Sequence, residues 1–476
     1  MPSLRLLVLA ALFTIASLGH AVVAQQSAPA YPTPTGTPTE NGLAGFAKIL
    51  CSGVFVSGRE PADVARGSAY FFMPRDEQDK VTFTIDRTQK IARATFGTTT
   101  REARLYGDQG CIIQAPGKPG VHFTPVPVNT TLPDAMTQAW PMGDKPATAP
   151  FPAGVDKTKI DAAVDAAFAD PNALTAGFLI VYKGRIVGER YAPGITKDTQ
   201  LESWSMGKSI TSTLFSLLVK DGTYTLEQPA PVPLWQQTPG DPRAKIRNID
   251  LLQMSGGLKF VGNQEPGGST QNTVLDHYFI YTGATDAFNF SITRPLEAPP
   301  GTMGRYRNCD PLTIGYLIKL AVQKRGQEYL TWPQRMLFDR IGIRRQVLET
   351  DPYGNFLLTG YDYGTARNWA RIGMLHAQDG MWQGQRILPE GWTRFVSTLA
   401  PGWPRPVYGG FFWINGDGGW NLPTDAYFAA GAGGQNTWIV PGRDLVIVRM
   451  GHMRGSGAAR RATNNALALI MEAVGK

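Results

Sequence analysis

Alternating apolar and polar residues mark short strands in the first third of the chain. The run 80–86, Lys-Val-Thr-Phe-Thr-Ile-Asp, places apolar side chains at every second position, and the run 90–96, Lys-Ile-Ala-Arg-Ala-Thr-Phe, does the same. A period of two is typical of a strand with one buried face. These runs predict a small β-rich N-terminal module over residues 43–150, which ends in the Pro- and Ala-rich stretch 145–154.

Two hairpins are predicted in the rest of the chain, one near each of its ends. Residues 177–182 and 186–191 are apolar runs separated by a Lys-Gly-Arg turn. Residues 436–440 and 445–450 repeat this arrangement around a Pro-Gly-Arg-Asp turn. Runs of this length on both sides of a Gly-containing turn favour antiparallel pairing.

The two hairpins are accompanied by helices. Helical spacing of apolar residues predicts one helix over 160–168 and a terminal helix over 464–474, and the segment between the hairpins reads as helices and loops. Strands at both ends with helices inserted between them predict one antiparallel sheet assembled from distant segments. The fold class is therefore α+β, with residues 151–476 as one large domain.

The chain begins with an apolar segment of the kind that directs export. Arg5 precedes the apolar run 6–18, and small residues close the segment at 21–24. This pattern predicts a signal peptide over residues 1–24 and a periplasmic or secreted protein. The apolar run is shorter than the roughly 20 residues that span a bilayer, and no other stretch is apolar enough to do so, which disfavours a membrane anchor. Residues 25–42, rich in Pro and Thr, are predicted to be an extended linker.

Charge and histidine spacing narrow the range of partners and cofactors. Among 476 residues, 43% are hydrophobic and 18% are charged, which is the balance of a globular protein. The net charge of +8 is scattered without a basic stripe, and this argues against nucleic acid as a partner. The five histidines (His20, His122, His277, His376 and His452) show no ligand spacing, so we expect no metal site.

The cysteines fit an oxidising compartment. Cys51 and Cys111 both lie in the N-terminal module, whereas Cys309 lies far along the chain. The simplest arrangement is a Cys51–Cys111 disulfide with Cys309 as a free, buried thiol.

Ser205-Met-Gly-Lys208 is the first candidate for chemistry. Apolar residues at helical spacing follow it, so the motif lies where a helix begins. Ser and Lys three positions apart share one face of a helix, and the amine can then reach the hydroxyl. A serine hydroxyl needs a neighbouring base to become a good nucleophile. Ser is also a favoured N-cap residue, so the motif alone is weak.

Tyr306-Arg-Asn308 strengthens the hypothesis. It lies in a loop that begins with Pro-Gly at residue 300 and runs into a helix, with Asp310 and Pro311 at its start. A phenol beside a lysine ammonium ion has its anionic form favoured, so Tyr306 could accept or relay the serine proton. The Asn308 amide could bond both the lysine and a substrate carbonyl.

These motifs together resemble the serine β-lactamase and penicillin-binding superfamily, in its class C and esterase branch. Four segments match in the family's order, at residues 205–208, 246–258, 300–308 and 365–389. The resemblance covers about residue 155 to the C-terminus. It implies a β-lactamase/transpeptidase-like antiparallel sheet flanked by helices, together with an all-helical subdomain.

The third motif departs from the family's pattern, which has Lys-Thr-Gly or His-x-Gly on the edge strand. Residues 431–436 read Gly-Ala-Gly-Gly-Gln-Asn instead. This stretch is similar to the 6-aminohexanoate-dimer hydrolases and related carboxylesterases. Small residues such as Gly434 allow a substrate backbone to approach closely. The Gln435 N–H is expected to complete an oxyanion hole with that of Ser205.

The predicted function is a serine hydrolase that cleaves an ester or amide bond in a small molecule through an acyl-enzyme, without a cofactor. Loss of the Lys-Thr-Gly cation disfavours the alternative of a β-lactamase or D-alanyl-D-alanine peptidase. A second alternative is a non-catalytic penicillin-fold binding protein, which the retained Ser205, Lys208 and Tyr306 disfavour. Homodimerisation is left open, and the N-terminal module is expected to shield the cleft, mediate dimers or support the fold.

Overall fold

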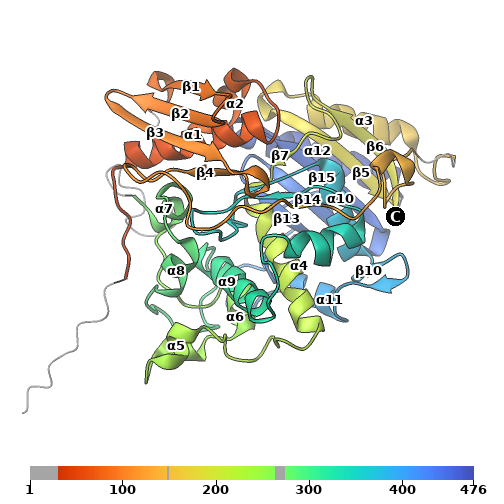
Figure 1. Ribbon diagram of the computed structural model, residues 1–476. Helices are drawn as coiled ribbons and strands as arrows, with labels where there is room; N and C mark the ends of the chain where they lie inside the picture. The colour runs from red at the N-terminus through yellow and green to blue at the C-terminus, as the bar shows by residue number, and fades with distance from the viewer. Residues whose placement is uncertain (1–30, 75, 147–149, 263–273, 476) are drawn as a thin grey trace, which may run out of the picture. The chain divides into compact units, whose positions relative to one another are not determined.

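The computed structural model describes residues 31–74, 76–146, 150–262 and 274–475. The described residues from 32 onward form one compact unit (Figure 1). The predicted signal peptide, residues 1–24, and the first part of the predicted linker, residues 25–30, lie outside the described residues. Within the described part of the chain, we find no helix with the length and apolar character needed to cross a membrane.

A six-stranded antiparallel sheet in the order β12-β13-β14-β15-β5-β6 organises the chain after residue 150. Its strands are β5 Thr175–Tyr182, β6 Arg185–Tyr191, β12 Trp413–Ile414, β13 Tyr427–Gly431, β14 Gln435–Val440 and β15 Leu445–Gly451. The two predicted hairpins are β5–β6 and β14–β15. They join where Val446 pairs with Val181 and Ile447 with Ile180. One sheet assembled from distant segments is therefore confirmed.

Helices cover both faces of this sheet. They are α3 Lys157–Phe168 and α12 Ser456–Ala473 on one face, and α4 Gly207–Lys220 and α10 Ala366–Ala377 on the other. Strand alternation divides the core accordingly, since Ile180 packs with the first pair and Val181 with the second. Each such side chain, fully buried, contributes about 1.5–3 kcal/mol. Helix α12 begins eight residues before the predicted 464, because its first turn is polar and small and carries no apolar period.

Short helices and strands fill the segment between the two halves of the sheet. The helices are α5 Pro233–Gln237, α6 Asn248–Leu252, α7 Asp276–Thr282, α8 Ala287–Ile292 and α9 Cys309–Lys324, which gather in the green part of Figure 1, and α11 Trp392–Val396, which follows α10. The strands are β7 Leu201–Glu202, β8 Val347–Leu348 and β9 Asp362–Gly364 in one small sheet, and β10 Met381–Trp382 and β11 Gln385–Arg386 in a hairpin. The mixed α+β class with a helical subdomain is confirmed.

The N-terminal module is a four-stranded antiparallel sheet with a helix packed against it. Its elements are α1 Pro38–Phe55, α2 Pro61–Gly67, β1 Thr82–Asp86, β2 Ile91–Phe96, β3 Thr99–Leu105 and β4 Cys111–Ile113. Both predicted strands are present as β1 and β2. The Cys51–Cys111 disulfide joins α1 to β4, and Cys309 is free and buried, so both cysteine predictions are confirmed.

Helix α1 corrects the prediction of a linker over residues 25–42. The helix begins at Pro38, inside that segment. The Thr37 hydroxyl accepts from the Glu40 N–H, and the Glu40 carboxylate accepts in return from the Thr37 N–H. Pro38 at the first helical position is compatible with this capping box. The Pro- and Thr-rich composition therefore hid a helix start, and the module is less purely β than predicted.

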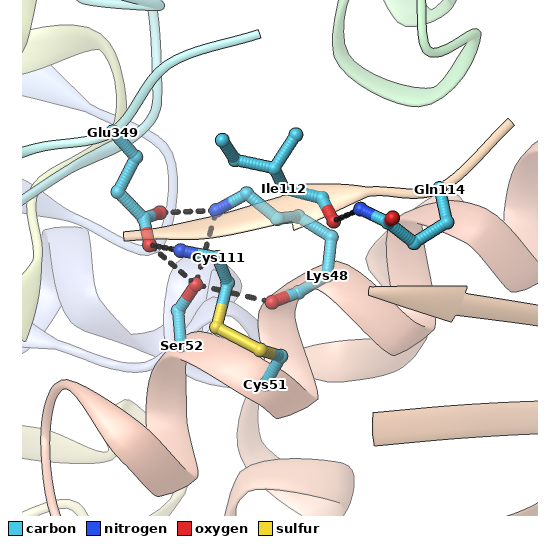
Figure 2. The surroundings of a disulfide bond; sticks show 7 residues. All are labelled: Lys48, Cys51, Ser52, Cys111, Ile112, Gln114 and Glu349. Carbon is cyan, nitrogen blue, oxygen red and sulfur yellow. Dashed lines mark hydrogen bonds and ion pairs between the residues drawn. A yellow bond between two sulfur atoms is a disulfide. The ribbon is translucent and has the colours of Figure 1, made fainter. Parts of the chain in front are cut away.

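A buried ion pair fixes the module to the rest of the chain (Figure 2). Lys48 of α1 bonds the Glu349 carboxylate, and both side chains are almost completely buried. The Ser52 hydroxyl and the Cys111 N–H each donate to the same carboxylate at 2.8 Å. A carboxylate removed from water is tolerated only when it is paired and hydrogen-bonded. The module and the larger domain therefore share one interior.

Candidate active site

Ser205 and Lys208 lie at the start of a buried helix, as the motif predicted. The chain leaves β7, makes a 3-10 turn over Trp204–Met206 and enters α4. Ser205 is partly exposed, whereas Lys208 is 1% exposed. The first turn of a helix leaves its N–H groups without intrahelical acceptors, so the Ser205 N–H is available to an external oxygen. The nucleophile candidate therefore faces solvent while its amine partner does not.

The two side chains are in hydrogen-bond contact. Lys208 Nζ lies 2.9 Å from Ser205 Oγ and donates to the Thr359 carbonyl at 2.7 Å. The Ser205 hydroxyl lies 3.3 Å from the same carbonyl. Burial lowers the pKa of Lys208 well below its ordinary value, and the charge of Asp362 opposes this shift only in part. A buried amine that favours its neutral form can accept the serine proton.

Tyr306 completes this group. Lys208 Nζ lies 4.9 Å from the centre of the Tyr306 ring, and Tyr306 is hydrogen-bonded to Ser205. The Trp413 ring stacks on the Tyr306 ring, with 5.4 Å between their centres. Burial raises the pKa of Tyr306, which corrects the expectation of a favoured phenolate. The reason is that burial of the phenol outweighs the hydrogen bond with Ser205, which favours the phenolate.

Asn308 makes different contacts from those that the sequence suggested. It is completely buried at the N-terminus of α9. Its Nδ2 lies 3.2 Å from His277 Nδ1 and 3.1 Å from the Tyr281 hydroxyl, while its Oδ1 has no partner among the described residues. A contact with the lysine and a substrate carbonyl was expected. The structure places the amide against two side chains of α7 instead.

His277, Tyr281 and Thr359 were missed by sequence reasoning. The Tyr281 hydroxyl donates to the Thr359 carbonyl at 2.7 Å. This one carbonyl oxygen therefore accepts hydrogen bonds from Tyr281, Lys208 and Ser205. His277 lies close enough to Lys208 for the lysine charge to lower its pKa. The aromatic character of residues 278–281 was the only signal in the sequence, and it did not distinguish a site from a core.

Gly431 at the end of strand β13, and not Gln435, makes the close approach to the nucleophile. A Cβ on Gly431 would lie 2.2 Å from the Ser203 carbonyl oxygen and 3.1 Å from the Ser205 nitrogen. Gln435 is fully buried at the start of β14, and its side-chain amide bonds both the N–H and the carbonyl of Gly451. Gln435 thus fastens the hairpin to β15, and the glycine is the residue that the nucleophile's turn requires.

A buried arginine holds the hairpin loop from behind. Arg449 Nη1 donates to the carbonyls of Gly433 and Gly434 at 3.0 and 2.9 Å. Arg449 Nη2 donates to the Ala173 carbonyl at 2.6 Å. Gly433 and Gly434 have φ of 84° and 74°, a region that favours glycine. Gly434 is therefore a loop residue whose carbonyl faces the arginine.

The N-terminal module reaches the residue before the nucleophile. Phe71 lies 5.1 Å from the Trp204 ring and Phe72 lies 5.9 Å from it, and Phe72 also contacts Tyr281 at 5.9 Å. Trp204 has φ of 51°, a strained value for a residue with a side chain. A Cβ on Gly45 of α1 would lie 2.3 Å from the Phe72 ring, which shows how closely the helix backs these aromatics. The module therefore supports the turn that carries Ser205.

Comparison with known proteins covers the larger domain. Residues 160–471 match the family model described as Beta-lactamase. The curated 6-aminohexanoate-dimer hydrolase of Paenarthrobacter ureafaciens is 24% identical over 297 residues, which are 58% of this chain and 72% of that protein.

Two solved structures are similar in fold. A penicillin-binding protein homologue from Caulobacter crescentus gives a TM-score of 0.51 at 16% identity, covering 68% of this chain and 99% of that one. A family VIII carboxylesterase gives a TM-score of 0.50 at 16% sequence identity, and the match covers 66% of this chain and 99% of that one. The family match leaves the N-terminal module outside its bounds.

Proposed function

Because the chain belongs to the beta-lactamase family of serine hydrolases, we propose that it cleaves an ester or amide bond in a small molecule, with Ser205 as nucleophile and Lys208 as its base. The observation that carries this proposal is the 2.9 Å contact between a partly exposed serine hydroxyl and a buried lysine amine whose pKa is lowered. The 6-aminohexanoate-dimer hydrolase relative supports an amide, and the carboxylesterase fold is compatible with an ester.

Acylation begins when the neutral Lys208 amine takes the proton of Ser205. The serine oxygen attacks the substrate carbonyl and forms a tetrahedral intermediate. Tyr306, neutral because burial raises its pKa, donates its proton to the leaving group and recovers one from Lys208. Water then attacks the acyl-enzyme with the same groups acting in reverse, and the acid leaves.

The oxyanion of the intermediate needs two N–H donors. Ser205 supplies one from the first turn before α4. Gly431 is the last residue of β13 and pairs with Gln435, so Ala432 is the first residue of the loop that follows the close approach to Ser205. We assign the second donor to Ala432 in place of Gln435, since Gly431 already lies against the Ser205 nitrogen.

A pocket beside the edge strand gives room for one arm of the substrate. It measures about 310 Å³, and its lining includes Trp413, Trp420, Gly431 and Arg460. Trp413 contacts Tyr306, and Gly431 contacts the turn of Ser205, so the pocket adjoins the proposed catalytic group. The aromatic walls suit an acyl or alkyl chain, and Asn436, Ser456, Arg460 and Thr463 add polar groups to the lining.

Mass spectrometry after treatment with a fluorophosphonate tests the proposal. Wild-type protein is expected to carry one adduct on Ser205, and Ser205→Ala is expected to carry none. Substrates are then compared as p-nitrophenyl esters, linear amide dimers and a chromogenic β-lactam. Absence of an adduct on the folded wild-type protein would exclude an activated serine and with it the hydrolase mechanism.

We also propose that the protein is exported. The apolar N-terminal segment and the fully buried Cys51–Cys111 disulfide support this proposal. Residues 1–42 fused to an alkaline phosphatase that is active only outside the cytoplasm should give active enzyme. The same fusion with Leu9→Arg and Leu12→Arg should not, and equal activity of the two fusions would refute export.

A further inference from the structure

The donor and acceptor of each hydrogen bond around Asn308 can be assigned by starting from the Thr359 carbonyl. A carbonyl oxygen only accepts, so the Tyr281 hydroxyl, at 2.7 Å, must use its proton there. The Tyr281 oxygen can then only accept from Asn308, 3.1 Å away, and this sets the NH₂ group of Asn308 on that side. The orientation of the amide follows from the network.

This orientation determines the tautomer of His277. The same Asn308 Nδ2 lies 3.2 Å from His277 Nδ1, so Nδ1 must accept the second amide hydrogen. A neutral imidazole that accepts at Nδ1 carries its proton on Nε2. Burial lowers the pKa of His277 to about 3, and the charge of Lys208 adds to this effect, so the ring stays neutral over the physiological range.

The His277 Nε2–H group is a donor without an acceptor in the part of the chain that the structure describes. No hydrogen bond from Nε2 is found among the described residues, and the Nε2 atom itself is not fully buried. The ring is partly exposed and lies near Lys208. Asn308, in contrast, has both amide hydrogens in use and is 0% exposed, so it has no donor left for a substrate.

We propose that His277 Nε2–H is a substrate-contacting hydrogen-bond donor, which binds an acceptor oxygen in the acyl part of the substrate. Asn308 and Tyr281 position this donor, and the substrate contact expected of Asn308 passes to His277. The favoured substrates then carry an amide, ketone or ether oxygen a few atoms from the reacting carbonyl. This inference rests on the proposed hydrolase function and specifies its substrate class.

A pair of esters separates substrate contact from a structural role. The p-nitrophenyl ester of N-acetylglycine has an amide in its acyl chain, and p-nitrophenyl pentanoate has the same chain length without it. His277→Asn keeps an acceptor for Asn308 but removes the Nε2 donor, whereas His277→Gln can place an amide N–H near the Nε2 position. His122→Asn, at an exposed histidine stacked on Tyr353, is the matched control.

His277→Asn should lower kcat/KM for the amide-bearing ester by about tenfold or more and change pentanoate by less than about twofold. His277→Gln should recover part of the loss, and His122→Asn should match wild type on both esters. An equal loss on both esters, or no loss on either, would overturn the proposal. Labelling of Ser205 by a small fluorophosphonate should persist in every variant. Its absence from wild type would instead refute the hydrolase function itself.

The tautomer is tested without any substrate. Long-range ¹H–¹⁵N spectra of protein labelled at histidine, with the His277 signals assigned by their loss in His277→Gln, should show a protonated Nε2 and a bare Nδ1. A proton on Nδ1 would contradict the hydrogen-bond orientation on which the proposal rests, whatever the kinetics.

Discussion

Removal of the Cys51–Cys111 disulfide, by changing both residues to alanine, should lower the free energy of unfolding by about 4 kcal/mol. The two residues are 60 positions apart. Closing a loop of this length removes about 14 cal/mol/K of chain entropy from the unfolded state, which is about 4 kcal/mol at 25 °C.

The loss of stability that follows removal of the disulfide should also affect the active site. The disulfide holds α1 against β4, and the Cys111 N–H donates to Glu349 within the interface shown in Figure 2. The same helix backs Phe72, which contacts Trp204 beside the nucleophile. We therefore expect Ser205 to lose its reactivity at the denaturant concentration at which the module unfolds.

Urea titration followed by tryptophan fluorescence gives the unfolding midpoint, and fluorophosphonate labelling of the same samples gives the fraction of reactive Ser205. Cys309→Ala is the matched control, because Cys309 is buried but unbonded, and it should cost only about 1 kcal/mol. Reduction of wild type should move its midpoint to that of the double variant. A double variant no less stable than Cys309→Ala would refute the reasoning.

Four further outcomes follow from the geometry. Gly431→Ala should abolish turnover, since its Cβ would collide with the turn before the nucleophile, while Gly457→Ala, which meets nothing within 4 Å, should be neutral in the same assay. Tyr306→Phe should lower kcat by about 10²–10⁴-fold with little change in KM, and an unchanged kcat would remove Tyr306 from proton transfer. In the pH profile of kcat/KM, the apparent pKa of the acidic side should be well below the ordinary lysine value of 10.5, because burial lowers the pKa of Lys208. An apparent pKa of 10.5 would contradict this. Burial raises the pKa of Asp362 from 3.8 to about 8, so the folded state binds this proton more tightly and stability falls as pH rises between these values; Asp362→Asn should flatten that fall in thermal melts, with a stability gain over wild type that grows from about pH 4 and is complete at about pH 8.

Local patterns predicted those parts of the molecule that local structure decides. The strands of both hairpins are set by short apolar runs and Gly turns, and the Ser205–Lys208 contact is set by one helical turn. Helix α1 was partly missed because Pro and Thr are common in linkers, although Thr37 and Glu40 form a readable capping box.

The remaining features depend on contacts between distant segments. Asn308 turns to His277 because α7 packs beside the start of α9, and no spacing in the sequence shows this. Gln435 lies in a glycine-rich stretch that suits an oxyanion hole, but which residue faces the nucleophile is decided by strand register. The pKa of Tyr306 rises because burial outweighs its neighbours, and burial is a property of the folded chain.

The shared interior of module and hydrolase has a consequence for where this protein can be cut. A shortened chain beginning near residue 160, where the family match starts, would retain Ser205, Lys208 and Tyr306. It would also expose Trp204 and leave the Glu349 carboxylate without three of its hydrogen-bond donors. A fragment that contains only the residues matched by the family should therefore be poorly soluble when it is produced alone. Co-expression with residues 32–150 as a separate chain would be the natural means of recovering it.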